Sequence, residues 1–176
     1  NHNVLPVIFT QGSLGASGDL APLSHLALPL IAEGVVKVDG SIIAAAKALQ
    51  HLGWQPINLQ SKEGLALING TQFMSAYGCY ILIHATKLAK WANTIAAISF
   101  DAFDCSTEPL NEFIHLVRSH KGQLSAAAEM RNLLQSSEIC GAKKSQVQDP
   151  YSFRCIPQVH GASAGAIEYV SEIFLK

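Results

Sequence analysis

The stretch that decides the fold is Thr71–Phe100, TQFMSAYGCYILIHATKLAKWANTIAAISF, which holds no proline and a single glycine, Gly78. At 1.5 Å per residue, thirty such residues predict a helix roughly 45 Å long. Apolar residues occur nearly all round its first half, as is typical of the central helix of a bundle. His84, Lys87 and Lys90 leave fewer than the ~20 apolar residues that a membrane span needs. We therefore expect a buried helix and no membrane span.

Working outward from this helix, breakers and caps predict shorter elements. Asp19 is a good N-cap for a helix over 20–32, which Pro29 should kink or shorten. Asp39-Gly40 between two β-branched runs predicts a hairpin over 35–43. Further helices are predicted at 44–52, 61–64, 109–118, 122–134 and 157–175, with loops at 1–18 and 136–149. The fold class is all-α: a long-helix bundle with one small surface β-hairpin, in a single helical segment over residues 1–176.

The charge balance limits the classes of partner. The chain has 12 Lys and Arg against 13 Asp and Glu, for a formal net charge of −1. This excludes the basic footprint of a nucleic-acid-binding protein. Only 14% of the residues are charged, against about 25% in an average soluble domain. We therefore expect large apolar faces that are buried against another part of the protein or another subunit.

Cysteines and histidines give no metal signature. The four cysteines, Cys79, Cys105, Cys140 and Cys155, form no C-x-x-C pair, and the histidines form no H-E-x-x-H set. The sequence predicts reduced, buried thiols in a cytoplasmic protein, with no metal site.

The segment that carries chemistry is Gly12–His25, GSLGASGDLAPLSH. Its glycine spacing matches neither dinucleotide nor P-loop phosphate motifs. A tight fold at Ala16-Ser17-Gly18 would let the Gly18 nitrogen attack the Ala16 carbonyl, a close approach that glycine permits. Loss of two waters, the second taking the Ser17 hydroxyl, leaves a ring with an exocyclic methylene, a strong electrophile. Asp19 lies next to this ring and could position it or accept a proton.

Gly12–Leu23 resembles the signature of the aromatic amino acid ammonia-lyases. Members of this family form the prosthetic group 4-methylidene-imidazol-5-one (MIO) autocatalytically from Ala-Ser-Gly, which implies the same for Ala16-Ser17-Gly18. Gly64–Thr71, GLALINGT, is similar to the family's Asn-Gly-Thr helix start, and Gln148–Cys155, QDPYSFRC, to its Gln-Asp-x-Tyr-Ser-x-Arg loop. The resemblance implies the central part of the family's fumarase/aspartase-like helical fold, with an MIO-forming loop at 12–19 and an active-site loop at 146–155.

The same resemblance implies roles for residues outside the tripeptide. Asn69 and Gln148 would help to hold the substrate adduct, and Arg154 would clamp the substrate carboxylate through its two-pronged guanidinium. Tyr151 would stabilise charge near the reacting atoms. In the family this loop reaches into a neighbouring subunit, which implies a homotetramer.

Within the family, the residues Gly15, Ala21 and His25 resemble the histidine and bacterial tyrosine enzymes, whereas the plant phenylalanine enzymes usually differ at these positions; together they favour the histidine-type branch. Residues 118–123, RSHKGQ, are similar to that branch's Arg-Pro-His-x-Gly-Gln, with Ser119 in place of the proline. The resemblance implies elimination of ammonia from L-histidine to give trans-urocanate. A tyrosine or phenylalanine ammonia-lyase, or an aminomutase of the same family, is the alternative.

The resemblance covers only the central third of the family's pattern, without its N-terminal tyrosine base. We therefore expect the chain to be a piece of a longer enzyme that cannot turn over substrate alone. Two non-enzymatic interpretations remain open: Ser17 and Asp19 as simple helix caps, which contribute about 1 kcal/mol each, and the chain as a non-catalytic helical oligomerisation module.

Overall fold

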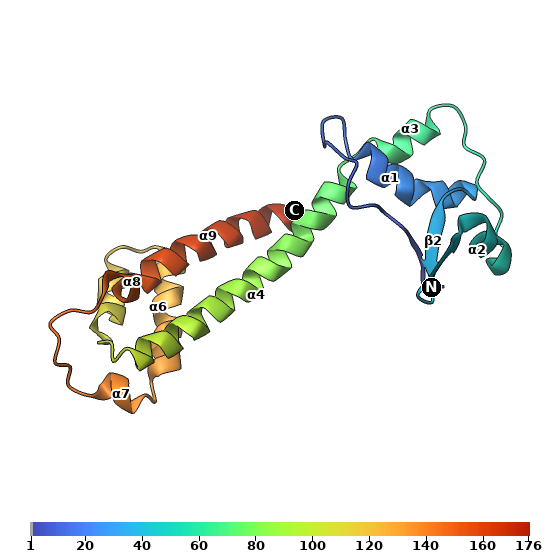
Figure 1. The fold of residues 1–176 in the computed structure, drawn as a ribbon. Coiled ribbons are helices and arrows are strands. Elements are labelled where there is room, and N and C mark those ends of the chain that lie inside the picture. The colour runs from blue at the N-terminus through green and yellow to red at the C-terminus, as the bar shows by residue number, and fades with distance from the viewer. Residues whose placement is uncertain (1) are drawn as a thin grey trace. The chain divides into compact units, whose positions relative to one another are not determined.

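The computed structural model describes residues 2–176, which form two compact units, one ending at Gly78 and one spanning Cys79–Lys176. The longest helix, α4 (Gln72–Ala102), begins in the first unit and continues into the second (Figure 1). It confirms the helix predicted at Thr71–Phe100 and, with the other helices, the all-α class. None of the helices in residues 2–176 combines the length and the apolarity that a membrane span requires.

The first unit sets helices against a small sheet. Its elements before α4 are β1 (Val4–Pro6), α1 (Leu20–Ala27), the 3-10 helix η1 (Leu28–Ile31), β2 (Val35–Val38), β3 (Ser41–Ala44), α2 (Ala45–Leu52) and α3 (Glu63–Ile68). The helix predicted over 20–32 is indeed shortened, since α1 gives way to η1 at the turn that contains Pro29. The sheet is antiparallel, and Val36 of β2 is buried with Ala45 and Ala48 of α2 in the small core of this unit.

The predicted hairpin forms, and a third strand adds to it. Asp39 and Gly40 adopt φ angles of +47° and +86°, as a type I′ turn requires. The expectation of a loop over residues 1–18 is wrong at Val4–Pro6, because β1 pairs with β2, Val4 opposite Val38. Three residues are too few to show an alternating pattern, and Pro6 is tolerated because β1 is an edge strand.

Every regular secondary-structure element of the second unit is a helix. After α4 it contains the 3-10 helix η2 (Glu108–Leu110), α5 (Glu112–Leu116), α6 (Lys121–Leu134), α7 (Glu138–Gly141), α8 (Tyr151–Arg154) and α9 (Ile156–Phe174). The single helix predicted over 109–118 is wrong: Asn111 has ψ +132° and breaks it, and its side chain accepts the Phe113 N–H at 3.0 Å to start α5. The turn α7 lies within a predicted loop, where the Ser137 hydroxyl caps it.

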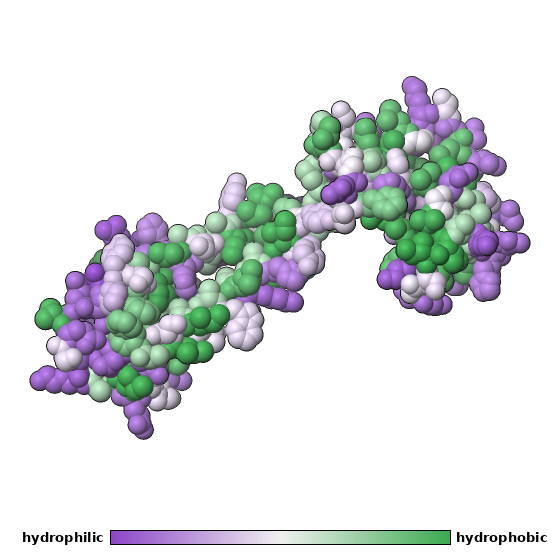
Figure 2. Space-filling view, in the orientation of Figure 1, coloured by the Kyte–Doolittle hydropathy of each residue, from purple (hydrophilic) through white to green (hydrophobic). Residues whose placement is uncertain are grey.

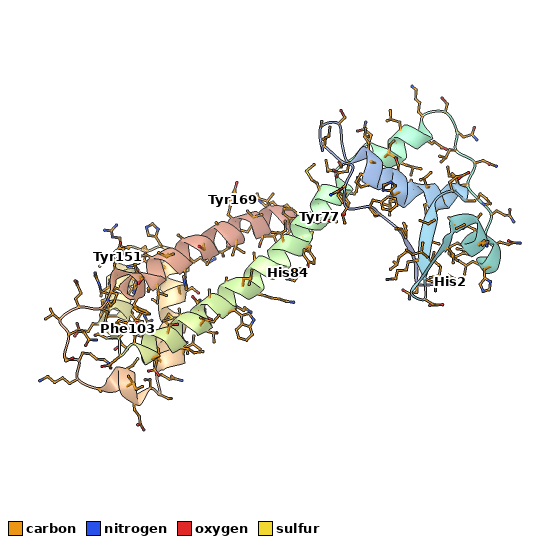
Figure 3. All side chains as sticks on the ribbon, in the orientation of Figure 1. His2, Tyr77, His84, Phe103, Tyr151 and Tyr169 are labelled. Atoms are coloured by element: carbon orange, nitrogen blue, oxygen red, sulfur yellow. The ribbon has the colours of Figure 1, made fainter. Side chains whose placement is uncertain are left out.

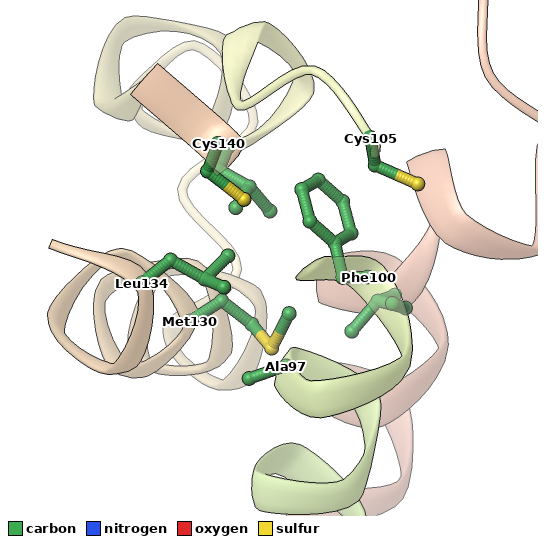
Figure 4. Close-up of a cluster of buried hydrophobic side chains, with 8 residues drawn as sticks. Ala97, Phe100, Cys105, Met130, Leu134 and Cys140 are labelled. Atoms are coloured by element: carbon green, nitrogen blue, oxygen red, sulfur yellow. The ribbon is translucent and has the colours of Figure 1, made fainter. Parts of the chain in front are cut away.

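The core of the second unit gathers at the C-terminal end of α4. Phe100 and Met130 are fully buried there, together with Cys105 and Cys140 (Figure 4). Of all α4 residues, only Asn93, Ala97 and Phe100 are buried. The expectation of a buried helix is therefore wrong for most of α4 in this chain. Many of its other apolar side chains are exposed (Figure 2), so the large apolar faces expected from the composition are present.

The cysteines follow their positions in this core. All four are free; Cys105 and Cys140 are buried, as expected. Burial raises the pKa of the Cys105 thiol to about 11, and the negative charge of Asp149 adds to the effect. The expectation of a buried thiol is wrong for Cys79, which lies on an exposed part of α4, and only partly met for Cys155, which is half-buried.

Helices α6 and α9 cross at a pair of glycines, where their backbones touch. A Cβ on Gly161 would lie 2.5 Å from the Cα of Gln123, and a Cβ on Gly122 would overlap the carbonyl of Gly161. Backbone atoms cannot retreat as a flexible side chain can. The crossing therefore depends on glycine at both positions.

We predict that Gly161→Ala lowers the free energy of unfolding by several kcal/mol, because the added methyl forces the two helices apart. Gly165→Ala is the matched control on the same helix: nothing lies within 4 Å of its Cβ position, so the substitution should stabilise by roughly 0.5–1 kcal/mol through helix propensity. Urea denaturation measures both. Equal effects at the two positions would contradict the backbone crossing.

Candidate active site

The tripeptide Ala16-Ser17-Gly18 lies in a glycine-rich turn that packs against the segment between α3 and α4. Gly18 has φ +101°, and a Cβ there would lie 2.8 Å from the carbonyl oxygen of Gly70. Only glycine fits this position, both for its dihedral angle and for the space. Ala16 and Ser17 are exposed, so the side chain expected to become an electrophile faces solvent.

Asn69 brings its amide to the same place. It is the C-cap residue of α3, and its Oδ1 lies 3.2 Å from the Cβ position of Gly18. The first two motifs, far apart in the sequence, thus meet within the first unit. A cradle that only glycine can enter, with an exposed serine before it and an amide beside it, fits the ring that the family forms from this tripeptide.

Asp19 fastens the turn to the start of α4. Its side chain is buried, 1% exposed. Its amide donates to the Gly70 carbonyl at 2.7 Å, and its Oδ2 accepts the Met74 N–H at 2.8 Å. Met74 lies in the first turn of α4, where backbone N–H groups have no partner within the helix, so the carboxylate caps α4 and complements the positive end of its dipole.

The prediction that Asp19 caps the helix beginning at Leu20 is therefore wrong for its side chain, which makes no capping hydrogen bond to α1. Only its backbone carbonyl serves α1, by accepting the Leu23 N–H at 2.9 Å. Aspartate does prefer helix N-termini, and Asp19 does cap one, but the capped helix is α4, which begins at Gln72.

The second candidate loop, 146–155, lies in the second unit and is held by another buried aspartate. Asp149 is 5% exposed. Its Oδ2 accepts the Ser106 N–H at 2.8 Å, and its Oδ1 accepts from the Gln146 amide at 3.1 Å. Sequence reasoning assigned no role to Asp149. The sequence did offer one signal: Asp149 follows Gln146 and Gln148 in a polar loop, where a carboxylate is a ready acceptor for amide and backbone N–H groups.

Arg154 is oriented within this loop by its own neighbours. Its Nε donates to the Asp149 carbonyl at 2.9 Å, and its guanidinium carbon lies 5.4 Å from the centre of the Tyr151 ring, within cation–π range. The two terminal nitrogens make no hydrogen bond within residues 2–176 and can therefore bind a planar anion. Tyr151, labelled in Figure 3, is 72% exposed on α8.

Gln148 is exposed beside Arg154. Both line a cavity of about 350 Å³ with Glu108, Asp149 and Gln158. The structure therefore groups Gln148, Tyr151 and Arg154 in one loop of the second unit, and it groups Asn69 with the tripeptide and Asp19 in the first unit.

The segment 118–123 departs from the histidine-type pattern for a reason visible in the backbone. Ser119 has φ +45°, which a proline cannot adopt because its ring fixes φ near −65°. The rest of the segment is well held: Gln123 donates its amide to Nδ1 of the fully buried His115 at 2.9 Å, and His115 Nε2 donates to the Pro109 carbonyl at 3.1 Å. Burial lowers the pKa of His115, which favours the neutral ring.

The chain matches the family model for aromatic amino acid lyases over residues 1–176. It is 48% identical to the histidine ammonia-lyase of Shouchella clausii (strain KSM-K16) over 176 residues, 99% of this chain and 35% of that protein. A solved histidine ammonia-lyase from Trypanosoma cruzi superimposes with a TM-score of 0.82 at 43% identity, over 97% of this chain and 31% of that one. An ergothionase structure from Treponema denticola superimposes with a TM-score of 0.92 at 32% identity, over 100% and 35% of the two chains.

The chain is a member of the aromatic amino acid lyase family, and its fold is the helical fold of that family. It spans about 35% of the length of the curated relatives it matches. The predicted family and fold are thus confirmed, while the role of each site residue stays a prediction.

We predict that Asp149→Ala loosens the loop that carries Arg154, because the Ser106 amide loses its acceptor. Leaving a fully buried donor unpaired costs roughly 1–3 kcal/mol, and Ser106 is half-buried, so we expect a loss at the low end of that range; Asp149→Asn keeps one acceptor oxygen and should cost less. Urea denaturation and limited proteolysis across 142–150 measure the effect. Glu108→Ala, at an exposed neighbouring acid, is the control; an equal loss there would show that the Asp149 carboxylate does not hold the loop.

Proposed function

We propose that the protein carrying this chain is a carbon–nitrogen lyase that eliminates ammonia from L-histidine to give trans-urocanate. The observation that carries the proposal is the turn at Ala16–Gly18, which is pinned against Gly70 and leaves Ser17 exposed. A main-chain ring closure needs this compression, and no ordinary helix cap does. The interpretation of Ser17 and Asp19 as simple helix caps is therefore less favoured, because of the two side chains only that of Asp19 caps a helix, and that helix is α4.

The residues of this chain divide the work by their chemistry. The MIO group, when present, supplies an electrophilic methylene carbon that takes up the substrate. Asn69 offers an amide at the edge of the tripeptide turn and Gln148 another in the second loop, each able to hold a polar group of the substrate. Arg154 presents two guanidinium nitrogens that suit a carboxylate, and the Tyr151 hydroxyl can stabilise charge that develops near the reacting atoms.

L-Histidine is the proposed substrate because the matched proteins from Shouchella clausii and Trypanosoma cruzi are histidine ammonia-lyases. Residues 118–123 support the same branch except at Ser119. The alternative within the class remains a tyrosine or phenylalanine ammonia-lyase, or an aminomutase. The free cysteines fit a reducing, cytoplasmic setting.

We predict that Ser17→Ala abolishes urocanate formation in the protein as its gene encodes it, because alanine has no hydroxyl to lose. Intact mass and peptide mapping should show a deficit of two waters at residues 16–18 in the wild type and none in the variant. Ser24→Ala, which removes a hydroxyl in the same unit, should retain both the deficit and the activity. Urocanate absorbance measures turnover.

Persistent activity of Ser17→Ala would contradict the role of Ser17 as the source of the electrophile. A wild-type tripeptide of unchanged mass would show that the prosthetic group does not form. Residues 1–176 alone, incubated with L-histidine, should give no steady urocanate signal. Steady turnover by them would contradict the expectation that further residues are needed.

We further propose that the protein self-associates, as the family's homotetramer implies. The supporting observation is an apolar stripe on α4 with the alternating three- and four-residue spacing of a coiled-coil seam. His84, labelled in Figure 3, is its one polar member. Every residue of the stripe is exposed: Ile81, His84, Leu88, Trp91, Ile95 and Ile98. This stripe also supports the second interpretation, a helical oligomerisation module.

We predict that Leu88→Glu shifts the protein to smaller oligomers. The Leu88 side chain is 67% exposed, and burying a leucine stabilises an interface by about 1.5–3 kcal/mol per copy, which a buried carboxylate would reverse. Light scattering coupled to size-exclusion chromatography measures the mass. Lys87→Glu places a carboxylate one position off the stripe and should leave the mass unchanged; a monomeric wild type would contradict the proposal.

A further inference from the structure

Ser13 links the two ends of the tripeptide through one oxygen atom. The Gly15 N–H donates to Ser13 Oγ at 3.2 Å, and the Ser13 hydroxyl donates to Asp19 Oδ1 at 3.3 Å. Gly15 directly precedes Ala16, and Asp19 directly follows Gly18. The bridge therefore spans Ala16-Ser17-Gly18 without touching any of its three residues.

One end of this bridge is fixed and the other is not. Asp19 is buried and hydrogen-bonded to Gly70 and Met74. Gly15 is exposed, and within residues 2–176 its amide bonds only to Ser13. Its φ of +66° lies in the left-handed region, and an unrestrained glycine populates regions of negative φ about as readily. The Ser13 hydroxyl is thus the link that ties the N-terminal side of the turn to the rigid Asp19 anchor.

We propose that Ser13 is a positioning residue for closure of the ring, an inference that rests on the proposed function. In closure, the Gly18 nitrogen bonds to the Ala16 carbonyl carbon, and its proton passes to the carbonyl oxygen. That oxygen leaves as water with the Ser17 amide proton, which creates a C=N bond. The second water takes the Ser17 Cα proton and hydroxyl and leaves the exocyclic C=C bond. No oxidant is required.

Ser13 acts on the first of these steps by limiting the conformations of the turn. Bringing the Gly18 nitrogen to the Ala16 carbon costs chain entropy that a pre-formed turn has already lost. The hydroxyl is not consumed in either dehydration. Its contribution is therefore to the rate of maturation, and not to the turnover of a subunit that already carries the ring.

The test compares Ser13→Thr with Ser13→Val in the protein as its gene encodes it. These side chains share a branched shape and differ in the hydroxyl. The two-water deficit at residues 16–18, followed by mass spectrometry at intervals after synthesis, gives the maturation rate. We expect the threonine variant to mature like the wild type and the valine variant at least about tenfold more slowly, since a misplacement of about 1 Å can cost ~100-fold.

Turnover per ring-containing subunit and thermal stability are measured on the same samples. We expect turnover per mature subunit to be unchanged in both variants, which a general structural defect would not produce. Ser24→Ala, which loses a hydroxyl bonded to the Leu20 carbonyl, controls for loss of a hydrogen bond in this unit and should mature normally.

Three outcomes overturn the inference: valine and threonine variants that mature at equal rates, a Ser24→Ala variant as slow as the valine variant, or slow maturation that merely follows lost stability. A wild-type protein that never loses two waters overturns the proposed function itself, and the two failures are thereby distinguished. If the valine variant does not fold, Ser13→Ala takes its place in the comparison with threonine.

Discussion

The buried carboxylate of Asp19 is the contact on which the first unit depends. The carboxylate accepts from the Ser13 hydroxyl in the glycine-rich turn and from the Met74 N–H at the start of α4, while the backbone carbonyl of Asp19 accepts from Leu23 in α1. A carboxylate removed from water requires such partners, since an unpaired buried charge is costly. Backbone and hydroxyl donors satisfy it here, so the geometry around the tripeptide follows from the needs of one charged group.

The same device recurs in the second unit. Asp149 is also buried and also accepts a backbone N–H from a distant segment, at Ser106. In both loops the aspartate lies two residues from a residue expected to do chemistry, and that residue is exposed: Ser17 beside Asp19, and Tyr151 beside Asp149. An exposed, reactive side chain needs a fixed backbone beneath it, and a buried acceptor supplies that without covering the side chain.

Much of this arrangement was predictable from the sequence, because some signals are local. The absence of proline from Thr71–Phe100 gave α4, Asp39-Gly40 gave the hairpin turn, and the three motifs gave the family. The partner of the Asp19 side chain was not predictable. An aspartate directly before a helix gives the same sequence pattern whether its side chain caps that helix or one that begins far along the chain. The strand at Val4–Pro6 and the break at Asn111 depend on contacts or dihedral angles with no periodic signature.

Asp19 meets Met74 across 55 positions of sequence, so the turn around Ser17 gains its anchor only when that much chain has been made and has folded back. On the proposed function, chemistry on the main chain at this turn would therefore be ordered in time, with the tertiary structure formed first and the covalent change second. A polypeptide that misfolds in this unit would keep three ordinary residues at positions 16–18. The modification would then serve as a permanent chemical record that the surrounding fold had been reached.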